Sequence, residues 1–194
     1  MVRLAFYRTI YADPPWGESG GGKICRGAQR HYPLMRTPDI AALPVGELAA
    51  AKAHLYLWVT NNFLKDGLYV AERWGFRYVT LITWKKQRVG LGQYFRGMTE
   101  HCIFAVRGNL PYRSRPDGKR AQGTTCIEAD RTEHSVKPEA VRQMIELVSY
   151  EPRLELFARG KHPGWDACGN EVLSDVRAAL VVPTLFSPPL SKGA

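Results

Sequence analysis

An acid, two prolines and a tryptophan follow a short apolar run near the start of the chain, at Asp13, Pro14, Pro15 and Trp16. The prolines fix their own φ angles and lack N–H donors, so the turn is expected to be stiff, with carbonyl groups free to accept hydrogen bonds. Asp13 adds a carboxylate, and Trp16 adds a flat aromatic face. Such a corner can hydrogen-bond an amino group and stack on the ring that carries it. The simpler alternative is a strand end with a capping aspartate and a buried tryptophan.

A nucleobase with an exocyclic amine fits this corner. The amine is a poor nucleophile because its lone pair is delocalised into the ring. If Asp13 and the carbonyl of Pro14 accept both amine hydrogens, a pyramidal nitrogen with an available lone pair is favoured. A paired base must first leave the stack, so the motif predicts chemistry on a flipped or single-stranded base.

The glycine-rich stretch that follows, Gly17 to Lys23, nearly matches a phosphate-binding loop. Ile24 stands where that motif needs a serine or threonine for magnesium, and the next residues make a poor helix. We interpret the stretch as a basic substrate loop. A nucleotide-binding phosphate loop is the weaker alternative.

Positive charge is concentrated in a few segments. The net charge is +9, and residues 23–36, 84–96 and 107–120 hold 13 of the 27 basic residues with a single acid. The rest of the chain is slightly acidic, which favours a polyanionic partner over an evenly charged solvated surface.

Alternating strand and helix patterns must position these residues. Apolar runs predict strands, and amphipathic patterns with capping signals predict helices. The expected strands are 4–12, 54–59, 78–84, 101–106, 124–129 and 153–158, and the expected helices are 63–74, 137–148 and 170–181. In helix 63–74, Leu64, Leu68, Ala71 and Trp74 are expected to face inward.

This alternation predicts an α/β fold with a mainly parallel sheet. We expect one domain over 1–182 and a loose proline-rich tail over 183–194. The four scattered cysteines and the lack of a membrane-spanning stretch or signal peptide favour a cytoplasmic protein with reduced thiols and no membrane association. No metal site is expected, although Cys102, His101 and His134 are a conceivable ligand set.

With these motifs, the chain resembles the N6-adenine methyltransferases related to the seventy-kilodalton catalytic subunit of the eukaryotic messenger-RNA adenosine methyltransferase. Asp13-Pro14-Pro15-Trp16 is the family signature. The similarity continues in order over about residues 7–172, in "HYPLM", "LYLWVTNNF", "WGFRYVTLITWKK", "EHCIFAVRGN", "RTEHSVKPEAVRQMIELVS" and "RLELFARGKHPGWDACGNEV". The resemblance implies a Rossmann-like methyltransferase fold with helices on both faces of the sheet and the motif order of the beta class.

The resemblance also implies residue roles and a cofactor, S-adenosylmethionine, with S-adenosylhomocysteine as product. Asp13 and Pro14 would orient the amine, and Trp16 would line the base pocket. The implied catalytic set is Asp13, Pro14, Pro15 and Trp16; the substrate set is Tyr32, His31, Lys23, Arg30 and Arg96; the cofactor set is Lys137, Ser135, Glu155, Arg159, Asn170 and Glu171. Lys137 would meet the cofactor carboxylate, and the last four would hold chiefly the ribose. Glu171 stands where the eukaryotic relatives have glutamine.

The function expected from the resemblance is methyl transfer to adenine in nucleic acid, with DNA favoured over RNA. A non-catalytic partner with the same fold is the main alternative. The compact form is typical of bacterial and phage members of the family, and the sequence leaves the oligomeric state open.

Overall fold

The computed structural model describes residues 6–17, 34–90, 94–130 and 137–176. The strands in these ranges are β1 (Tyr7–Ala12), β2 (Ala49–Val59), β3 (Arg77–Lys85), β4 (Thr99–Arg107), β5 (Cys126–Glu128), β6 (Arg153–Leu156) and β7 (Asp166–Cys168). The helices are α1 (Thr37–Ala41), α2 (Val45–Leu48), the 3-10 turn η2 (Asn61–Phe63), α3 (Leu64–Arg73) and α4 (Glu139–Val148). The expected tail, 183–194, lies outside the described residues.

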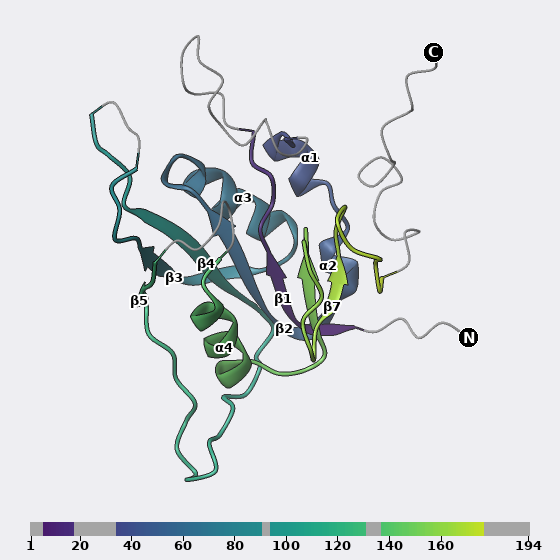
Figure 1. Ribbon diagram of the computed structural model, residues 1–194. Helices are drawn as coiled ribbons and strands as arrows, with labels where there is room; N and C mark the ends of the chain where they lie inside the picture. The colour runs from purple at the N-terminus through teal and green to yellow at the C-terminus, as the bar shows by residue number, and fades with distance from the viewer. Residues whose placement is uncertain (1–5, 18–33, 91–93, 131–136, 177–194) are drawn as a thin grey trace.

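The strands form one seven-stranded sheet in the order β5-β3-β4-β2-β1-β6-β7. Neighbouring strands run parallel except at β4, which is antiparallel to both β2 and β3. The predicted, mainly parallel sheet is therefore confirmed. Parallel strands place their carboxyl ends at one edge, so the segments after β1, β2, β3, β6 and β7 emerge on the same side (Figure 1).

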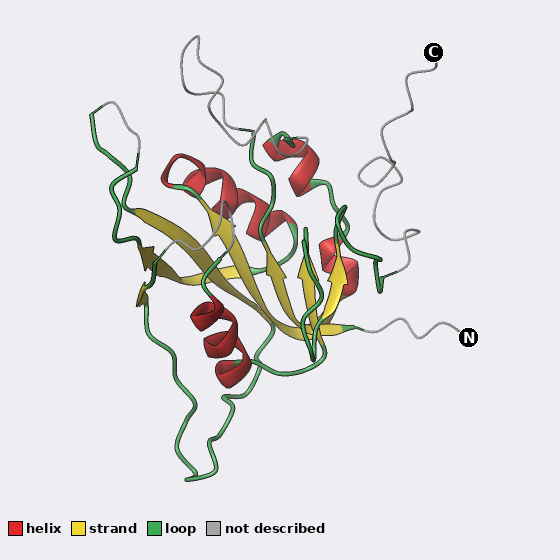
Figure 2. Ribbon diagram, in the orientation of Figure 1, coloured by secondary structure: helices red, strands yellow, loops and turns green. Residues whose placement is uncertain are grey.

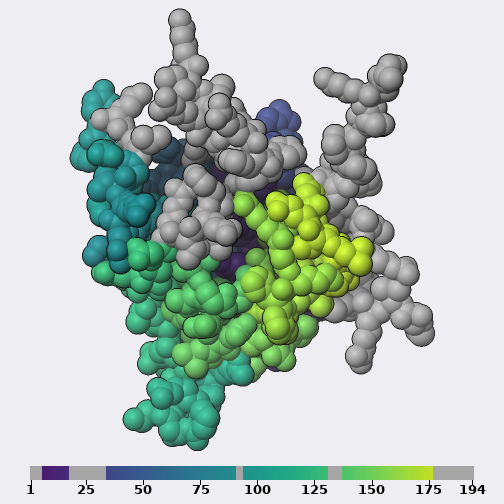
Figure 3. Space-filling view, viewed as in Figure 1, coloured from purple at the N-terminus to yellow at the C-terminus, as the bar shows by residue number. Residues whose placement is uncertain are grey.

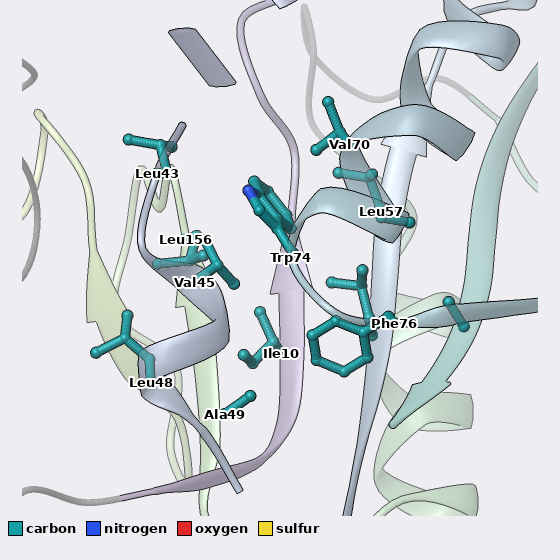
Figure 4. Close-up of a cluster of buried hydrophobic side chains, with 14 of the residues drawn as sticks. Ile10, Leu43, Val45, Leu48, Ala49, Leu57, Val70, Trp74, Phe76 and Leu156 are labelled. Atoms are coloured by element: carbon teal, nitrogen blue, oxygen red, sulfur yellow. The ribbon is translucent and has the colours of Figure 1, made fainter. Parts of the chain in front are cut away.

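Helices cover both faces of the sheet, as predicted (Figure 2). On one face, the apolar side chains of α1, α2 and α3 pack on the sheet around Ile10, Leu57 and Trp74 (Figure 4). On the other face, Val141 and Ile145 of α4 are fully buried against Tyr11 and Trp58. Each such aliphatic side chain contributes about 1.5–3 kcal/mol when it leaves water. A Rossmann-like α/β fold requires this burial of both faces of the sheet by helices.

β1 lies inside the sheet, between β2 and β6. Ile10 and Ala12 are fully buried on the α3 face and Tyr11 is buried on the α4 face, which explains the continuous apolar run in the sequence. In the space-filling view, the purple N-terminal segment is seen only at depth near the centre of the face, behind α4 and the C-terminal strands (Figure 3). Asp13 follows directly from this central strand.

Several boundaries differ from the prediction. β2 begins at Ala49, five residues before the expected start, and the short elements α1, α2 and β7 were not predicted from the sequence. The helix expected over 170–181 is wrong for residues 170–176, which form turns and bends, and the remainder lies outside the described residues. Here Asp175 accepts the N–H of Ala167 through its side chain and so ties the segment back to β7.

The buried face of α3 also differs from the expected one. Leu68 is exposed, and Gly67, Val70 and Ala71 face the sheet instead. A Cβ on residue 67 would lie 2.3 Å from Cγ1 of Val59. The absent side chain therefore lets the helix approach the sheet, which a periodicity based on large apolar residues does not reveal. Among the described residues, no helix is both long and apolar enough to cross a membrane.

Candidate active site

The carboxyl ends of β1 and β6 lie next to each other at one edge of the sheet. From β1 the chain passes to β2 on one side, whereas β6 pairs with β1 on the other side, so the strand order reverses at this point. Ligands of open α/β sheets bind outside the strand ends at such a reversal. Asp13 follows β1 here, and Phe157 follows β6 with a φ of 62°. A left-handed backbone at a bulky residue costs on the order of 1–3 kcal/mol and is found at functional sites.

Asp13 is joined to a chain of charged side chains. Nζ of Lys137 donates to Oδ2 of Asp13 at 2.7 Å and lies 3.4 Å from Oε2 of Glu100. Glu100 also accepts from the ammonium of Lys86. Lys137 lies just before α4, and its ammonium sits 5.2 Å from the ring centroid of Trp58 in β2. Three separate parts of the chain thus bring alternating charges to the end of β1.

The surroundings shift the pKa values of these groups. Burial raises the pKa of the Asp13 carboxyl, although the charge and hydrogen bond of Lys137 act against it. Burial alone would lower the pKa of Lys137 and raise that of Glu100, but attraction between the opposite charges outweighs burial at both. Lys137 therefore stays charged and Glu100 ionised, while Asp13 becomes a better proton acceptor than an exposed aspartate. A cluster of perturbed groups at a strand end is typical of a functional site.

The proline turn is held by its own backbone. The carbonyl of Pro14 accepts the N–H of Trp16 at 2.9 Å, and the carbonyl of Pro15 accepts the N–H of Met35 at 2.8 Å. The expectation that both carbonyls are free is therefore wrong, because the turn folds back on itself and pairs with residue 35. A carbonyl oxygen has a second lone pair, so Pro14 retains the capacity to accept an amine hydrogen.

Trp16 packs inside the protein. Its indole is 6% exposed, stacks on Phe63 and donates Nε1–H to the carbonyl of Trp58 at 2.8 Å. These contacts anchor the end of the turn on β2 and give Trp16 a structural role beside Asp13. Its predicted role as a wall of the base pocket stays a prediction.

Three of the residues expected to bind the cofactor lie beyond the ends of β6 and β7. Nε of Arg159 is 3.9 Å from Oε1 of Glu171, and Asn170 occupies the exposed turn between the strand end and Glu171. The positive charge of Arg159 is among the influences that lower the pKa of Asp13. The segments after β6 and β7 approach each other closely here, since a Cβ on Gly169 would lie 2.0 Å from the carbonyl oxygen of Ala158. Only glycine permits this close approach of the two segments.

Glu155 has a different environment from the other three. It lies on the α4 face of β6, where its Oε2 is 2.8 Å from Nη1 of Arg142. The guanidinium of Arg142 also lies 5.1 Å from the ring centroid of Trp165 and 5.5 Å from that of Tyr11. The opposite charge of Arg142 compensates the buried acid, although neither of the two contacting atoms makes a hydrogen bond within the described residues. Contact of Glu155 with a cofactor stays a prediction.

Five of the predicted site residues fall outside the described residues, namely Lys23, Arg30, His31, Tyr32 and Ser135, as do most of the glycine-rich stretch and His134. Arg96 is described, and it lies on the exposed hairpin between β3 and β4. The two basic segments that lie mostly within the described residues, 84–96 and 107–120, do not form one surface. Residues 107–120 leave the sheet next to the start of β2, at the edge opposite Asp13, whereas 84–96 leave it at the Asp13 edge (Figure 1).

Sequence reasoning missed Glu100, Lys86, Trp58 and Arg142 as parts of this region. Glu100 and Lys86 each flank an apolar strand run, and charged residues at strand ends are the signal that could have drawn attention to them. The partner of each lies on another element, so the pairing itself was not visible in the sequence.

The fold is of the Rossmann-like class, and the charged cluster lies at the end of β1. The family model MT-A70 matches residues 7–171. The chain therefore belongs to the MT-A70 family of N6-adenine methyltransferases.

Relatives in this family include both bacterial and animal proteins. The type II methyltransferase M.MunI of a Mycoplasma species is 30% identical over 185 residues, which cover 86% of this chain and 78% of that protein. The human N(6)-adenine-specific methyltransferase METTL4 is 29% identical over 201 residues, 89% of this chain and 40% of that protein. The non-catalytic subunit METTL14 of the Drosophila melanogaster N(6)-adenosine methyltransferase is 26% identical over 173 residues, 80% of this chain and 43% of that protein.

Proposed function

We propose that this protein uses S-adenosylmethionine to methylate the N6 amine of adenine in nucleic acid, with DNA as the favoured substrate. The observation that carries the proposal is the contact between Asp13 and Lys137 at the reversal point of the sheet. It brings together a carboxylate that can accept from an amine and a cation that can hold an acidic ligand group.

The residues present fit the cofactor that the family implies. An ammonium group has three donors, and within the described residues two acidic partners of Lys137 are found, Asp13 and Glu100. A third N–H of this ammonium group suits the carboxylate of the methionine moiety, and the nearby Arg159 adds a second cation. Asn170 and Glu171 offer amide and carboxylate oxygens to vicinal hydroxyls. When bound, S-adenosylmethionine supplies a methyl group activated by a sulfonium.

Asp13 is suited to prepare the amine and to receive its positive charge. Its carboxylate accepts one amine hydrogen, and the second lone pair of the Pro14 carbonyl accepts the other. As the nitrogen gains a methyl group it gains positive charge, which a fixed carboxylate stabilises without reorganising. Burial raises the pKa of Asp13, so the carboxylate can then take the surplus proton and pass it to solvent. No covalent enzyme intermediate is required, and positioning supplies much of the catalysis.

One observation favours DNA. M.MunI, of which the chain covers 78%, is a type II methyltransferase, the class that modifies DNA. The basic residues between β3 and β4 leave the same edge of the sheet as Asp13, where they can meet the phosphates of either nucleic acid beside a bound base.

A labelling experiment tests the proposal. The protein is incubated with methyl-labelled S-adenosylmethionine and matched DNA or RNA oligonucleotides, which are then digested to nucleosides. We expect label in N6-methyladenosine or its deoxy form, with more product from DNA. An Asp13→Asn variant is expected to retain its fold and lose at least about 100-fold in rate. Wild-type protein that binds the cofactor but labels no adenine would contradict the proposal and favour a non-catalytic partner.

A further inference from the structure

The hairpin between β3 and β4 carries an unusual pair of side chains. Tyr94 and Phe95 are 93% and 91% exposed, more than any other large apolar residue in the described part of the chain. Neighbouring aromatic rings that gain nothing from the core are a hydrophobic liability in water. Their exposure therefore indicates a binding surface for a ligand that stacks on aromatic rings.

The arms of the hairpin are fixed by hydrogen bonds. Lys86 donates its backbone N–H to the carbonyl of Met98, and Gly90 donates to that of Gly97, both at 2.7 Å. Nε of Arg96 donates to the carbonyl of Gly90 at 2.9 Å. Tyr94 and Phe95 lie just beyond the last of these backbone pairs, so the rings are carried by a hairpin with a hydrogen-bonded stem.

The base of the hairpin is linked to the active site. The ammonium of Lys86 pairs with Glu100, which lies 3.4 Å from Lys137, which in turn contacts Asp13. The hairpin rises from the sheet edge that also carries the end of β1 (Figure 1). The exposed rings therefore belong to the face on which a substrate of Asp13 must lie.

The charge beside the rings suits a nucleic acid. Residues 84–96 contain four basic residues and no acid. Within the described residues, Lys85 and Lys86 are paired with acids, whereas the exposed Arg88 and Arg96 have no acidic partner. Unpaired cations flanking exposed aromatic rings combine phosphate attraction with base stacking, as single-strand binding surfaces do.

We propose that Tyr94 and Phe95 stack on the nucleotides next to the target adenine and hold open the gap left when that adenine leaves a duplex. The inference rests on the proposed function and assigns to it a double-stranded substrate. Extrusion breaks stacking on both sides of the base, and an inserted aromatic ring replaces part of that contact. A single strand has no stack to open, so it depends less on the rings.

The test compares a Tyr94→Ala/Phe95→Ala double variant with Tyr112→Ala, which removes another exposed ring, 70% exposed, from the loop at the opposite edge. Methylation is measured on one oligonucleotide as duplex and as single strand. A second duplex carries 2-aminopurine in place of the target adenine, and its fluorescence rises when the base leaves the stack.

We expect the double variant to lose roughly ten-fold or more in duplex methylation and most of the fluorescence rise, with a smaller loss on the single strand. Exchange of the two rings, Tyr94→Phe/Phe95→Tyr, should restore both readouts, and the melting temperature should not change because both side chains are exposed. Double-variant behaviour equal to that of Tyr112→Ala would overturn the inference. The inference would also be overturned if the wild type forms an oligomer, the double variant is a monomer, and both methylate the duplex equally well.

The two proposals fail differently. If the wild type transfers no methyl group to any adenine, the proposed function fails, while the fluorescence rise still tests the rings. If the wild type methylates duplexes and the double variant does so equally well, only the role of the rings fails.

Discussion

Lys137 contacts Asp13 at 2.7 Å although 124 residues separate them in the chain. The contact joins the segment before α4 to the end of β1, and Glu100 holds the same ammonium from the start of β4. Lys137 can therefore tune Asp13 and still offer a donor to a ligand carboxylate. This double role leads to the first two predictions.

Replacement of Lys137 should weaken cofactor binding. We expect Lys137→Met, which keeps the volume and removes the charge, to raise the dissociation constant for S-adenosylmethionine by about ten-fold or more, since hydrogen bonds to charged groups contribute roughly 1.5–3 kcal/mol. Calorimetry measures the constant directly. Lys85→Met, which removes an exposed lysine paired with Glu128, is the control and should bind normally. Unchanged affinity in the first variant would remove Lys137 from the cofactor site.

The rate should fall in acid at a pH above the ordinary pKa of aspartate, 3.8. Asp13 accepts hydrogen bonds from the amine only when ionised, and burial raises its pKa, so protonation removes activity as the pH falls through that raised value. In Lys137→Met the stabilising positive charge is lost, and the acid limb of kcat should move to still higher pH. A limb that does not move would show that another group controls it.

Breaking the pair between Arg142 and Glu155 should destabilise the fold. Arg142→Met leaves the Glu155 carboxylate without its buried partner, which typically costs about 3–5 kcal/mol. The double variant Arg142→Met/Glu155→Leu should recover much of that loss in urea unfolding. Cofactor affinity measured in the double variant also tests the predicted binding role of Glu155. Affinity equal to the wild type would make Glu155 purely structural.

The contact of Gly67 with the sheet predicts a strong effect of one methyl group. A Cβ there would lie 2.3 Å from Val59 and 2.8 Å from Ile103, so Gly67→Ala should cost about 1–3 kcal/mol and lower the melting temperature by several degrees. Gly160→Ala is the matched control, because a Cβ at that position meets nothing within 4 Å. Equal melting temperatures for the two variants would show that α3 and the sheet can shift to accommodate the methyl group without loss of stability.

Local patterns predicted most of the fold. Continuous apolar runs indicated β1, β2 and β4, because strands covered on both faces need apolar residues at most positions. The run over β3 also indicated a strand, although Tyr78 and Val79 in its first half are exposed. The Pro138 start signal and the spacing of Val141 and Ile145 predicted α4. The short strand β7 and the exposed Leu68 were missed or misassigned, since three residues carry too little pattern and a glycine contact has no hydrophobic signature.

Local sequence was enough to predict a carboxylate on a stiff proline turn at the end of β1, followed by family motifs in the expected order. Which charged side chains meet became visible in the folded chain alone. In the structure Lys137 lies next to both Asp13 and Glu100, and Glu155 pairs with Arg142. The basic loop after β4 lies at the opposite edge of the sheet from the basic hairpin before β4. The reason is that ion pairs depend on distance in space, which strand order and direction set, and those are properties of the assembled sheet and not of any local run of residues.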